Sequence, residues 1–221
     1  MKFRQDFFVF NPVNPVNPVE VFSTAHFVHP FGKSGLSFKI LVFSESIAIV
    51  PDLNPGDGDV LGTMKIVVMS DTHLSKTTEE FKALCSEFCD DADMVIHLGD
   101  WDKVEILNYL EQYPLEAVAG NMDDYLIRQR LPASRILKAG PFRLGITHGW
   151  GSRGGIRQRL EQEFAGTDAV LFGHTHQPFI FRENGLLWFN PGSVFLGRGS
   201  CRKTLGVLTI QDKIEAEILQ I

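Results

Sequence analysis

Residues 65–73 read KIVVMSDTH, an apolar run that is followed at once by Asp71 and His73. The β-branched residues of the run predict a buried strand. A carboxylate and an imidazole at the end of a strand are both side chains that bind metal ions in proteins. The stretch therefore predicts a strand with functional groups at its carboxyl end, and the rest of the chain repeats this arrangement.

Four further apolar runs end in the same way: MVIHL precedes Gly99 and Asp100, EAVA precedes Gly120 and Asn121, RLGIT precedes His148 and Gly149, and AVLF precedes Gly173, His174, Thr175 and His176. In an extended backbone, residues i and i+2 point to the same side with Cα atoms roughly 6.5 Å apart, so the last two histidines can converge. Open α/β sheets bind ligands outside the carboxyl ends of their strands. We therefore expect these side chains to gather at one rim.

The runs also indicate the fold class. Helical patterns at 78–89 (TEEFKALCSEFC) and 102–113 (DKVEILNYLEQY) separate the first three runs, and GIRQRLEQEF at 155–164 predicts another helix. Residues 178–190 and 204–221 predict hairpins that turn near Asn184-Gly185 and near Gln211-Asp212. The sequence thus predicts an α/β domain that begins with βαβ units and ends in antiparallel strands.

Composition narrows the function classes. The net charge of −6 provides no global basic field, so stable nucleic-acid binding is not expected. The apolar runs fall far short of the ~20 residues that a membrane span needs. The chain has 3 cysteines, an odd and sparse set that favours a reducing cytoplasm over a disulfide scaffold. We expect Cys85 and Cys89 to be buried helix residues rather than a redox or zinc pair.

The first 63 residues differ from the rest. They include NPVNPVNPV at 11–19, and Asn-Pro steps favour turns or extended chain and cannot continue a helix. We expect 1–63 to be an N-terminal extension, either disordered or an over-extended gene start, with a functional domain as the alternative, and 64–221 to be the folded domain.

The side chains at the strand ends match a two-metal site. Two aspartates, one asparagine and four histidines are too many ligands for one tetrahedral zinc ion. Two divalent ions about 3.5 to 4 Å apart, sharing a carboxylate and a water-derived hydroxide, would use all seven. The mixed nitrogen and oxygen set favours Mn²⁺, Fe²⁺, Ni²⁺ or Zn²⁺. Taken singly, each residue also has a structural explanation, as a helix cap, a turn residue or a core histidine. The seven candidates are Asp71, His73, Asp100, Asn121, His148, His174 and His176.

In this order, the motifs D-x-H, G-D, G-N, H-G and G-H-T-H resemble those of the calcineurin-like metallophosphoesterases. The likeness is strongest to small bacterial and archaeal phosphodiesterases related to the phosphoesterase-fold subunit of retromer. N-P-G-S at 190–193, followed by Arg198, is also similar to that subgroup's pattern. The resemblance covers 64–221.

The resemblance implies two packed β-sheets flanked by helices, a four-layer sandwich. It implies that Asp71, His73, Asp100 and His176 hold the first metal, and that Asp100, Asn121, His148 and His174 hold the second, with Asp100 bridging. We predict catalytic roles for Asp100, Asn121 and His148, and Mn²⁺ as the first choice of ion. The predicted function is metal-dependent hydrolysis of a small-molecule or nucleotide phosphodiester by the bridging hydroxide. A catalytically weak protein-binding scaffold is the alternative, and a homo-oligomer is left open.

Residues beside the motifs add weaker predictions. Asn121 and Arg153 are candidates to bind the substrate phosphate, as is Arg198. For both arginines, an exposed loop residue without such a role is the alternative. His97 is expected behind the ligands or in packing. Asp123 and Asp124 are expected to cap the following helix, with a contact behind the ligands as the alternative. Trp101 and Trp150 would either line a pocket or pack.

Met122 bears on the substrate. Many phosphomonoesterases of the family have a histidine directly after the Gly-Asn motif, where it is thought to protonate the leaving group or bind the phosphoryl oxygen. A thioether has no acidic proton and is a weak acceptor. We therefore predict a preference for phosphodiesters over alkyl monoesters.

Overall fold

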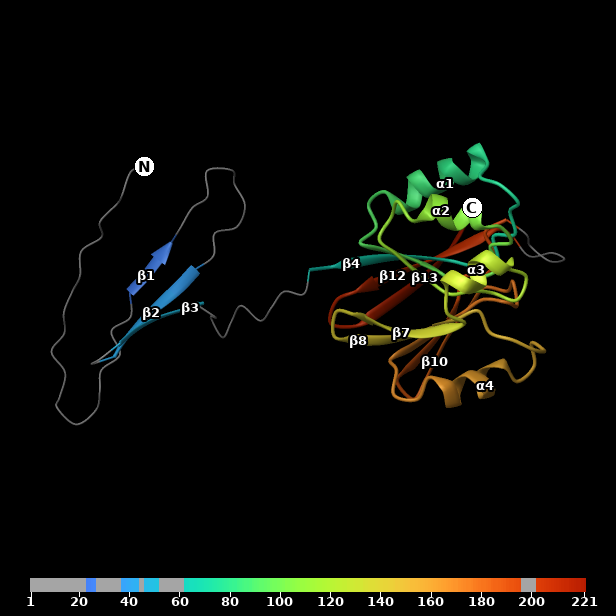
Figure 1. Cartoon of the computed structure of the whole chain (residues 1–221). Coiled ribbons are helices and arrows are strands. Elements are labelled where there is room, and N and C mark those ends of the chain that lie inside the picture. The colour runs from blue at the N-terminus through green and yellow to red at the C-terminus, as the bar shows by residue number, and fades with distance from the viewer. Residues whose placement is uncertain (1–22, 27–36, 44–45, 52–61, 196–201) are drawn as a thin grey trace. The chain divides into compact units, whose positions relative to one another are not determined.

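The computed structural model describes residues 23–26, 37–43, 46–51, 62–195 and 202–221 (Figure 1). The chain divides into two units, 1–60 and 61–221. In the first unit, three strands form an antiparallel sheet in the order β1-β2-β3: β1 (Ser23–His26), β2 (Ser37–Phe43) and β3 (Ser46–Pro51). The other residues of the predicted extension up to 61 lie outside the described residues. The division into an extension of 1–63 and a folded domain of 64–221 stays a prediction.

The second unit contains two five-stranded mixed sheets. The first has the order β13-β12-β4-β5-β6. Its members are β4 (Met64–Met69), β5 (Met94–His97), β6 (Leu115–Ala117), β12 (Thr204–Ile210) and β13 (Ile214–Gln220). The first three run parallel and are linked by α1 (Glu79–Cys89) and α2 (Val104–Leu110), whereas the last two form an antiparallel hairpin. The predicted βαβ beginning and antiparallel end are both present.

The second sheet has the order β10-β11-β9-β8-β7. Its members are β7 (Ser134–Ala139), β8 (Phe142–Thr147), β9 (Ala169–Phe172), β10 (Phe179–Glu183) and β11 (Leu186–Asn190). Helix α4 (Ile156–Glu163) connects the parallel strands β8 and β9 of this sheet. Helix α3 (Tyr125–Arg130) precedes β7 in the chain, but its buried residue Ile127 packs in the cluster of α1, α2 and the first sheet. The predicted hairpin turns at Asn184 and Gly185, which have φ of 51° and 83°, as tight hairpin turns require.

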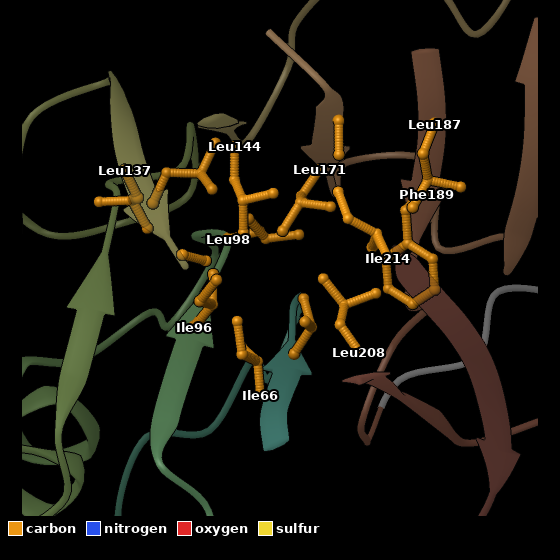
Figure 2. Close-up of a cluster of buried hydrophobic side chains, with 14 of the residues drawn as sticks. Ile66, Ile96, Leu98, Leu137, Leu144, Leu171, Leu187, Phe189, Leu208 and Ile214 are labelled. Atoms are coloured by element: carbon orange, nitrogen blue, oxygen red, sulfur yellow. The ribbon is translucent and has the colours of Figure 1, made fainter. Parts of the chain in front are cut away.

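The two sheets pack face to face, with α1 and α2 on the outer face of the first sheet and α4 on the outer face of the second (Figure 1). Between the sheets, Ile66 and Ile96 on one side meet Leu144 and Leu171 on the other (Figure 2). Burying each such side chain contributes about 1.5–3 kcal/mol. A second cluster packs α1 and α2 against the first sheet, and a third packs α4 against the second sheet. This order of helix, sheet, sheet and helix confirms the predicted fold.

Two elements have weak signals in the sequence. Strand β7 lies at the edge of its sheet, and only Leu137 and Ala139 of its residues are buried, so it lacks the apolar run that marks the other strands. Helix α3 is six residues long and buries only Ile127. Cys85 and Cys89 are buried and free in α1, which confirms that they pack. Within the described ranges, every helix is too short or too polar to cross a membrane.

Candidate metal centre

The predicted ligands converge where the strands end. Asp71 and His73 follow β4, Asp100 follows β5, and the other candidates follow β6, β8 and β9. Two overlapping groups have one potential ligand atom per residue, all within 4.8 Å of one another. One group is Asp71, His73 and His176, and the other is Asp71, Asp100 and His148. Five of the seven predicted ligands therefore share one small volume.

The contacts within this volume are close. The Nε2 atom of His176 lies 2.9 Å from Oδ1 of Asp71 and 3.3 Å from Nε2 of His73. The Oδ2 atom of Asp100 lies 3.2 Å from Nε2 of His148 and 3.6 Å from Nε2 of His73. Asp100 thus lies between histidines of the two groups, while Asp71 belongs to both groups. Which carboxylate bridges stays a prediction.

Each aspartate anchors one oxygen and presents the other. Oδ2 of Asp71 accepts hydrogen bonds from Ser70 Oγ at 2.6 Å and from the backbone N–H of His174 at 3.1 Å. Oδ1 of Asp71 is buried and has no hydrogen-bond partner of proper geometry among the described residues. Oδ1 of Asp100 accepts from the Met122 N–H at 2.8 Å, which leaves Oδ2 facing the histidines. One oxygen of each carboxylate is therefore available to a cation.

His148 is held in the same manner. Its Nδ1 lies 2.8 Å from the Leu98 carbonyl oxygen and donates to it, so Nε2 of the neutral ring carries a lone pair. This Nε2 is buried without a hydrogen-bond partner in the described structure and faces Asp100. A lone pair that faces a carboxylate is repulsive unless positive charge lies between them. The donor set thus fits a metal cation at this position.

The pKa values of His148 and Asp100 also indicate that positive charge is favoured at this position. Burial lowers the pKa of His148, but Asp100 and Asp71 outweigh burial, and the pKa lies above its ordinary value. Burial raises the pKa of Asp100, but His148, the Met122 N–H and His73 hold it below the usual range. The site therefore stabilises positive charge next to ionised carboxylates.

His174 and Asn121 lie beside the two groups rather than within them. Nδ1 of His174 is 3.0 Å from Oδ1 of Asn121, and its Nε2 is 2.9 Å from the carbonyl oxygen of Gly151. The His174 ring is edge-on to His148, with a centroid distance of 5.3 Å. The structure therefore brings both residues next to His148, and their coordination of a metal stays a prediction.

The backbone at the site is strained. Left-handed conformations cost L-residues roughly 1–2 kcal/mol each, and such strain gathers at functional sites. Of the non-glycine residues with positive φ in the described ranges, all except Asn184 belong to this rim. They are Asp71, His73, Asp100, Asp102, His174 and His176. The packing that holds them in place overcomes a substantial local cost.

Close packing also explains two glycines of the motifs. A Cβ on Gly120 would lie 2.2 Å from both the backbone N and Oδ1 of Asp100. A Cβ on Gly173 would lie 2.0 Å from Ser70 Oγ. A side chain at either position would displace a carboxylate or its hydrogen-bond donor.

Asp102 has a role that sequence reasoning missed. Its Oδ1 lies 2.8 Å from Nδ1 of His73, which directs Nε2 of that ring toward Asp71 and Asp100. The only sequence signal is an acidic residue two positions after Asp100, and its importance depends on the fold of the loop after β5.

Of the two roles predicted for Asp123, the helix cap is wrong, and the alternative, a contact behind the ligands, is the one found. Its carboxylate accepts backbone N–H groups of Trp101 at 2.6 Å, Asp102 at 3.0 Å and Gly120 at 2.6 Å, and so joins the loops after β5 and β6. Burial nevertheless raises the pKa of Asp123. Asp124 is the N-cap of α3, since its side chain accepts from the Ile127 N–H.

His97 both packs and supports the ligand loops. Its ring stacks on Trp101 at a centroid distance of 3.5 Å. Its Nε2 is 2.7 Å from Thr72 Oγ1, and its Nδ1 accepts from the Gly99 N–H at 3.2 Å. Burial, together with His148, keeps its pKa well below the ordinary value, so the ring is neutral.

The N-P-G-S motif supports the same loops. Asn190 Nδ2 donates to the Gly173 carbonyl at 2.8 Å and to Thr175 Oγ1 at 3.1 Å. Ser193 Oγ donates to the Asp71 carbonyl at 2.8 Å. The motif therefore holds the G-H-T-H loop and the D-x-H loop in place.

Two cavities are lined by candidate ligands or by residues next to them in the sequence. Arg153 is exposed and, with Thr175, lines a cavity of about 290 Å³. Trp150 is 46% exposed and lines a cavity of about 400 Å³ together with Asn121 and His148. Trp101 is fully buried and packs, and Arg198 lies outside the described residues.

Comparison with known proteins agrees with this arrangement. Residues 64–213 match the calcineurin-like phosphoesterase superfamily domain. A probable metallophosphoesterase of Methanocaldococcus jannaschii is 39% identical over 167 residues, covering 72% of this chain and 83% of the relative. Vacuolar protein sorting 29 of Cryptosporidium parvum has a similar fold, with a TM-score of 0.57, 18% identity and coverage of 72% and 98%. A novel archaeal phosphodiesterase has a TM-score of 0.55, 23% identity and coverage of 72% and 100%.

Proposed function

The chain belongs to the calcineurin-like phosphoesterase superfamily, and on this basis we propose that it hydrolyses phosphodiesters with the help of two divalent metal ions. The observation that carries the proposal is the pair of buried atoms without hydrogen-bond partners in the described structure, Asp71 Oδ1 and His148 Nε2, at the centre of the candidate ligands. Mn²⁺ is the proposed ion, with Ni²⁺, Fe²⁺ and Zn²⁺ as alternatives.

The candidate ligands divide between two positions. Asp71, His73 and His176, with Asp100, would hold one ion, and Asp100, Asn121, His148 and His174 would hold the other. Bound ions of this kind activate water as a nucleophile and neutralise charge that develops on the phosphate. Two aspartates alone would repel an anionic substrate, so the site depends on that positive charge.

The remaining residues of the rim orient the substrate. The exposed Asn121 amide can donate to a nonbridging phosphate oxygen, and the exposed Arg153 lines a cavity together with Thr175, the residue between His174 and His176. Met122 is 56% exposed at the rim and offers no acidic proton to a leaving alcohol. The cavity lined by Asn121 and His148 provides room for an ester group. These features support a diester with a stable leaving group as the substrate.

The alternative is a protein-binding scaffold on the same fold. A scaffold does not require a complete ligand set, a strained backbone at six rim residues or supporting carboxylates behind the histidines. All seven candidate ligands are present in this chain. These features favour the enzyme.

The test is metal dependence. Protein stripped with a chelator should not hydrolyse bis(p-nitrophenyl) phosphate and should regain activity with Mn²⁺, and calorimetry should show two Mn²⁺ sites per chain. Asp100→Asn should weaken Mn²⁺ binding at least tenfold. Asp212→Asn, at the exposed turn of the last hairpin, is the matched control and should bind normally. Full activity of the stripped protein would refute the proposal.

A further inference from the structure

The cavity of about 400 Å³ beside Asn121 and His148 has a distinctive lining. Trp150 and Leu131 provide apolar surface, while Arg128 and Glu163 contribute one charge of each sign. Its volume falls in the range of small-molecule binding sites, roughly 300–1,000 Å³. Asn121 and His148 are also candidate ligands of the metal centre. A chemical group bound in this cavity would therefore lie next to the reacting phosphate, where an ester group of the substrate would be.

Trp150 is unusual among the tryptophans of the chain. It is 46% exposed, whereas Trp101 is 0% and Trp188 is 3% exposed. Its loop is nevertheless fixed in place. The Arg159 guanidinium donates to the carbonyls of Trp150 at 2.7 Å, Ser152 at 2.6 Å and Gly154 at 3.3 Å.

The same loop is also tied to the metal centre. The carbonyl oxygen of Gly151, the next residue after Trp150, lies 2.9 Å from Nε2 of His174. The exposed indole therefore sits on a loop with a fixed position beside the candidate ligands, which makes it suitable as a wall for a flat group.

Arg128 and Glu163 complete the lining. Neither side chain has an ion pair or hydrogen bond within the described part of the chain, although Arg130 on the same helix bonds Glu111 and Asn108. A guanidinium offers only donors and a carboxylate offers only acceptors. Together they suit a ring whose edge carries both acceptors and donors, which a nucleobase has and a simple phenyl group lacks.

We propose that this cavity binds the nucleoside ester group of a phosphodiester, with the base stacked on Trp150 and its polar edge at Arg128 and Glu163. The inference rests on the proposed function, since it places the reacting phosphate at the metal centre. Stacking of a base on an aromatic side chain is worth about 1–3 kcal/mol. That energy corresponds to a rate or affinity ratio of about 5 to 150.

The test compares two diesters that share a leaving group. With Mn²⁺-loaded full-length protein, kcat/KM for the p-nitrophenyl ester of thymidine 5′-monophosphate should exceed that for methyl p-nitrophenyl phosphate by about tenfold or more. Trp150→Ala should bring the ratio near one, and Trp150→Phe should retain most of it. Arg128→Gln should lower the ratio, whereas Arg130→Gln, the matched control on the same helix, should not.

A binding measurement separates this inference from the proposed function. Thymidine 5′-monophosphate should quench the fluorescence of the one exposed tryptophan, and Arg128→Gln but not Arg130→Gln should weaken this binding. Equal kcat/KM for the two diesters in the wild type would overturn the nucleoside site and leave the diesterase intact. If neither diester is cleaved, the proposed function fails, and absence of quenching would then overturn the nucleoside site as well.

Discussion

Nδ1 of His73 lies 2.8 Å from Oδ1 of Asp102, and the Nε2 atom of the same ring faces Asp71 and Asp100. A carboxylate behind a histidine ligand fixes the tautomer and the ring orientation and makes the ligating nitrogen more basic. Asp102 is itself held by Asp123, through the hydrogen bond from its backbone N–H. The candidate metal ligands are therefore supported by residues outside the candidate set.

The first prediction concerns Asp102. Asp102→Ala should weaken Mn²⁺ binding by about 10- to 100-fold, because His73 would lose its fixed orientation. Isothermal titration calorimetry measures this change, with Asp212→Ala as the control. Unchanged Mn²⁺ affinity in a folded Asp102→Ala protein would show that the pair has no supporting role.

The second prediction concerns Gly120. Gly120→Ala places a Cβ against the backbone N and Oδ1 of Asp100, and crowding of this kind costs typically 1–3 kcal/mol. We expect a lower free energy of unfolding in urea and weaker Mn²⁺ binding. Gly62→Ala is the control, because its Cβ would meet nothing within 4 Å. Equal stability of both variants would contradict the close approach of the two loops.

The ligand loops could be predicted because each follows a short apolar run that marks a buried strand. Asp71, Asp100 and His148 stand directly after such runs, and parallel strands bring their carboxyl ends to one rim. The role of Asp102 could not be predicted, and for Asp123 the sequence could not decide between a helix cap and a contact behind the ligands. Their partners are His73 and the Gly120 N–H, which come close only after the loops fold.

The sequence also did not predict the strand at the edge of the second sheet. Strand β7 has a neighbour on one side only, and its residues Arg135 and Ile136 are exposed, so its pattern is not that of a buried strand. The sequence also could not decide the role of the Trp150 indole. An aromatic residue in a glycine-rich loop can pack or line a cavity, and only the fold of the loop decides between them.

The third prediction concerns the first 63 residues. A protein that begins at Met64 should fold and should bind Mn²⁺ as tightly as the full chain, because all candidate ligands and the three hydrophobic clusters lie after residue 63. Thermal unfolding and calorimetry on both proteins measure this. A truncated protein that is insoluble or markedly less stable would show that the extension contributes to the fold.

The most direct test of the account compares bis(p-nitrophenyl) phosphate with p-nitrophenyl phosphate, which share a leaving group. Met122 offers no proton for general-acid assistance, which is typically worth 10²- to 10⁴-fold, so poor leaving groups should be disfavoured. Met122→His should raise activity toward alkyl monoesters. The Asp100→Asn variant measures the hydrolysis that does not depend on the candidate metal centre. For the Mn²⁺-loaded wild type, we predict a higher kcat/KM for the diester. A monoester preferred by about tenfold, or about 1.4 kcal/mol in activation free energy, would contradict the phosphodiesterase assignment.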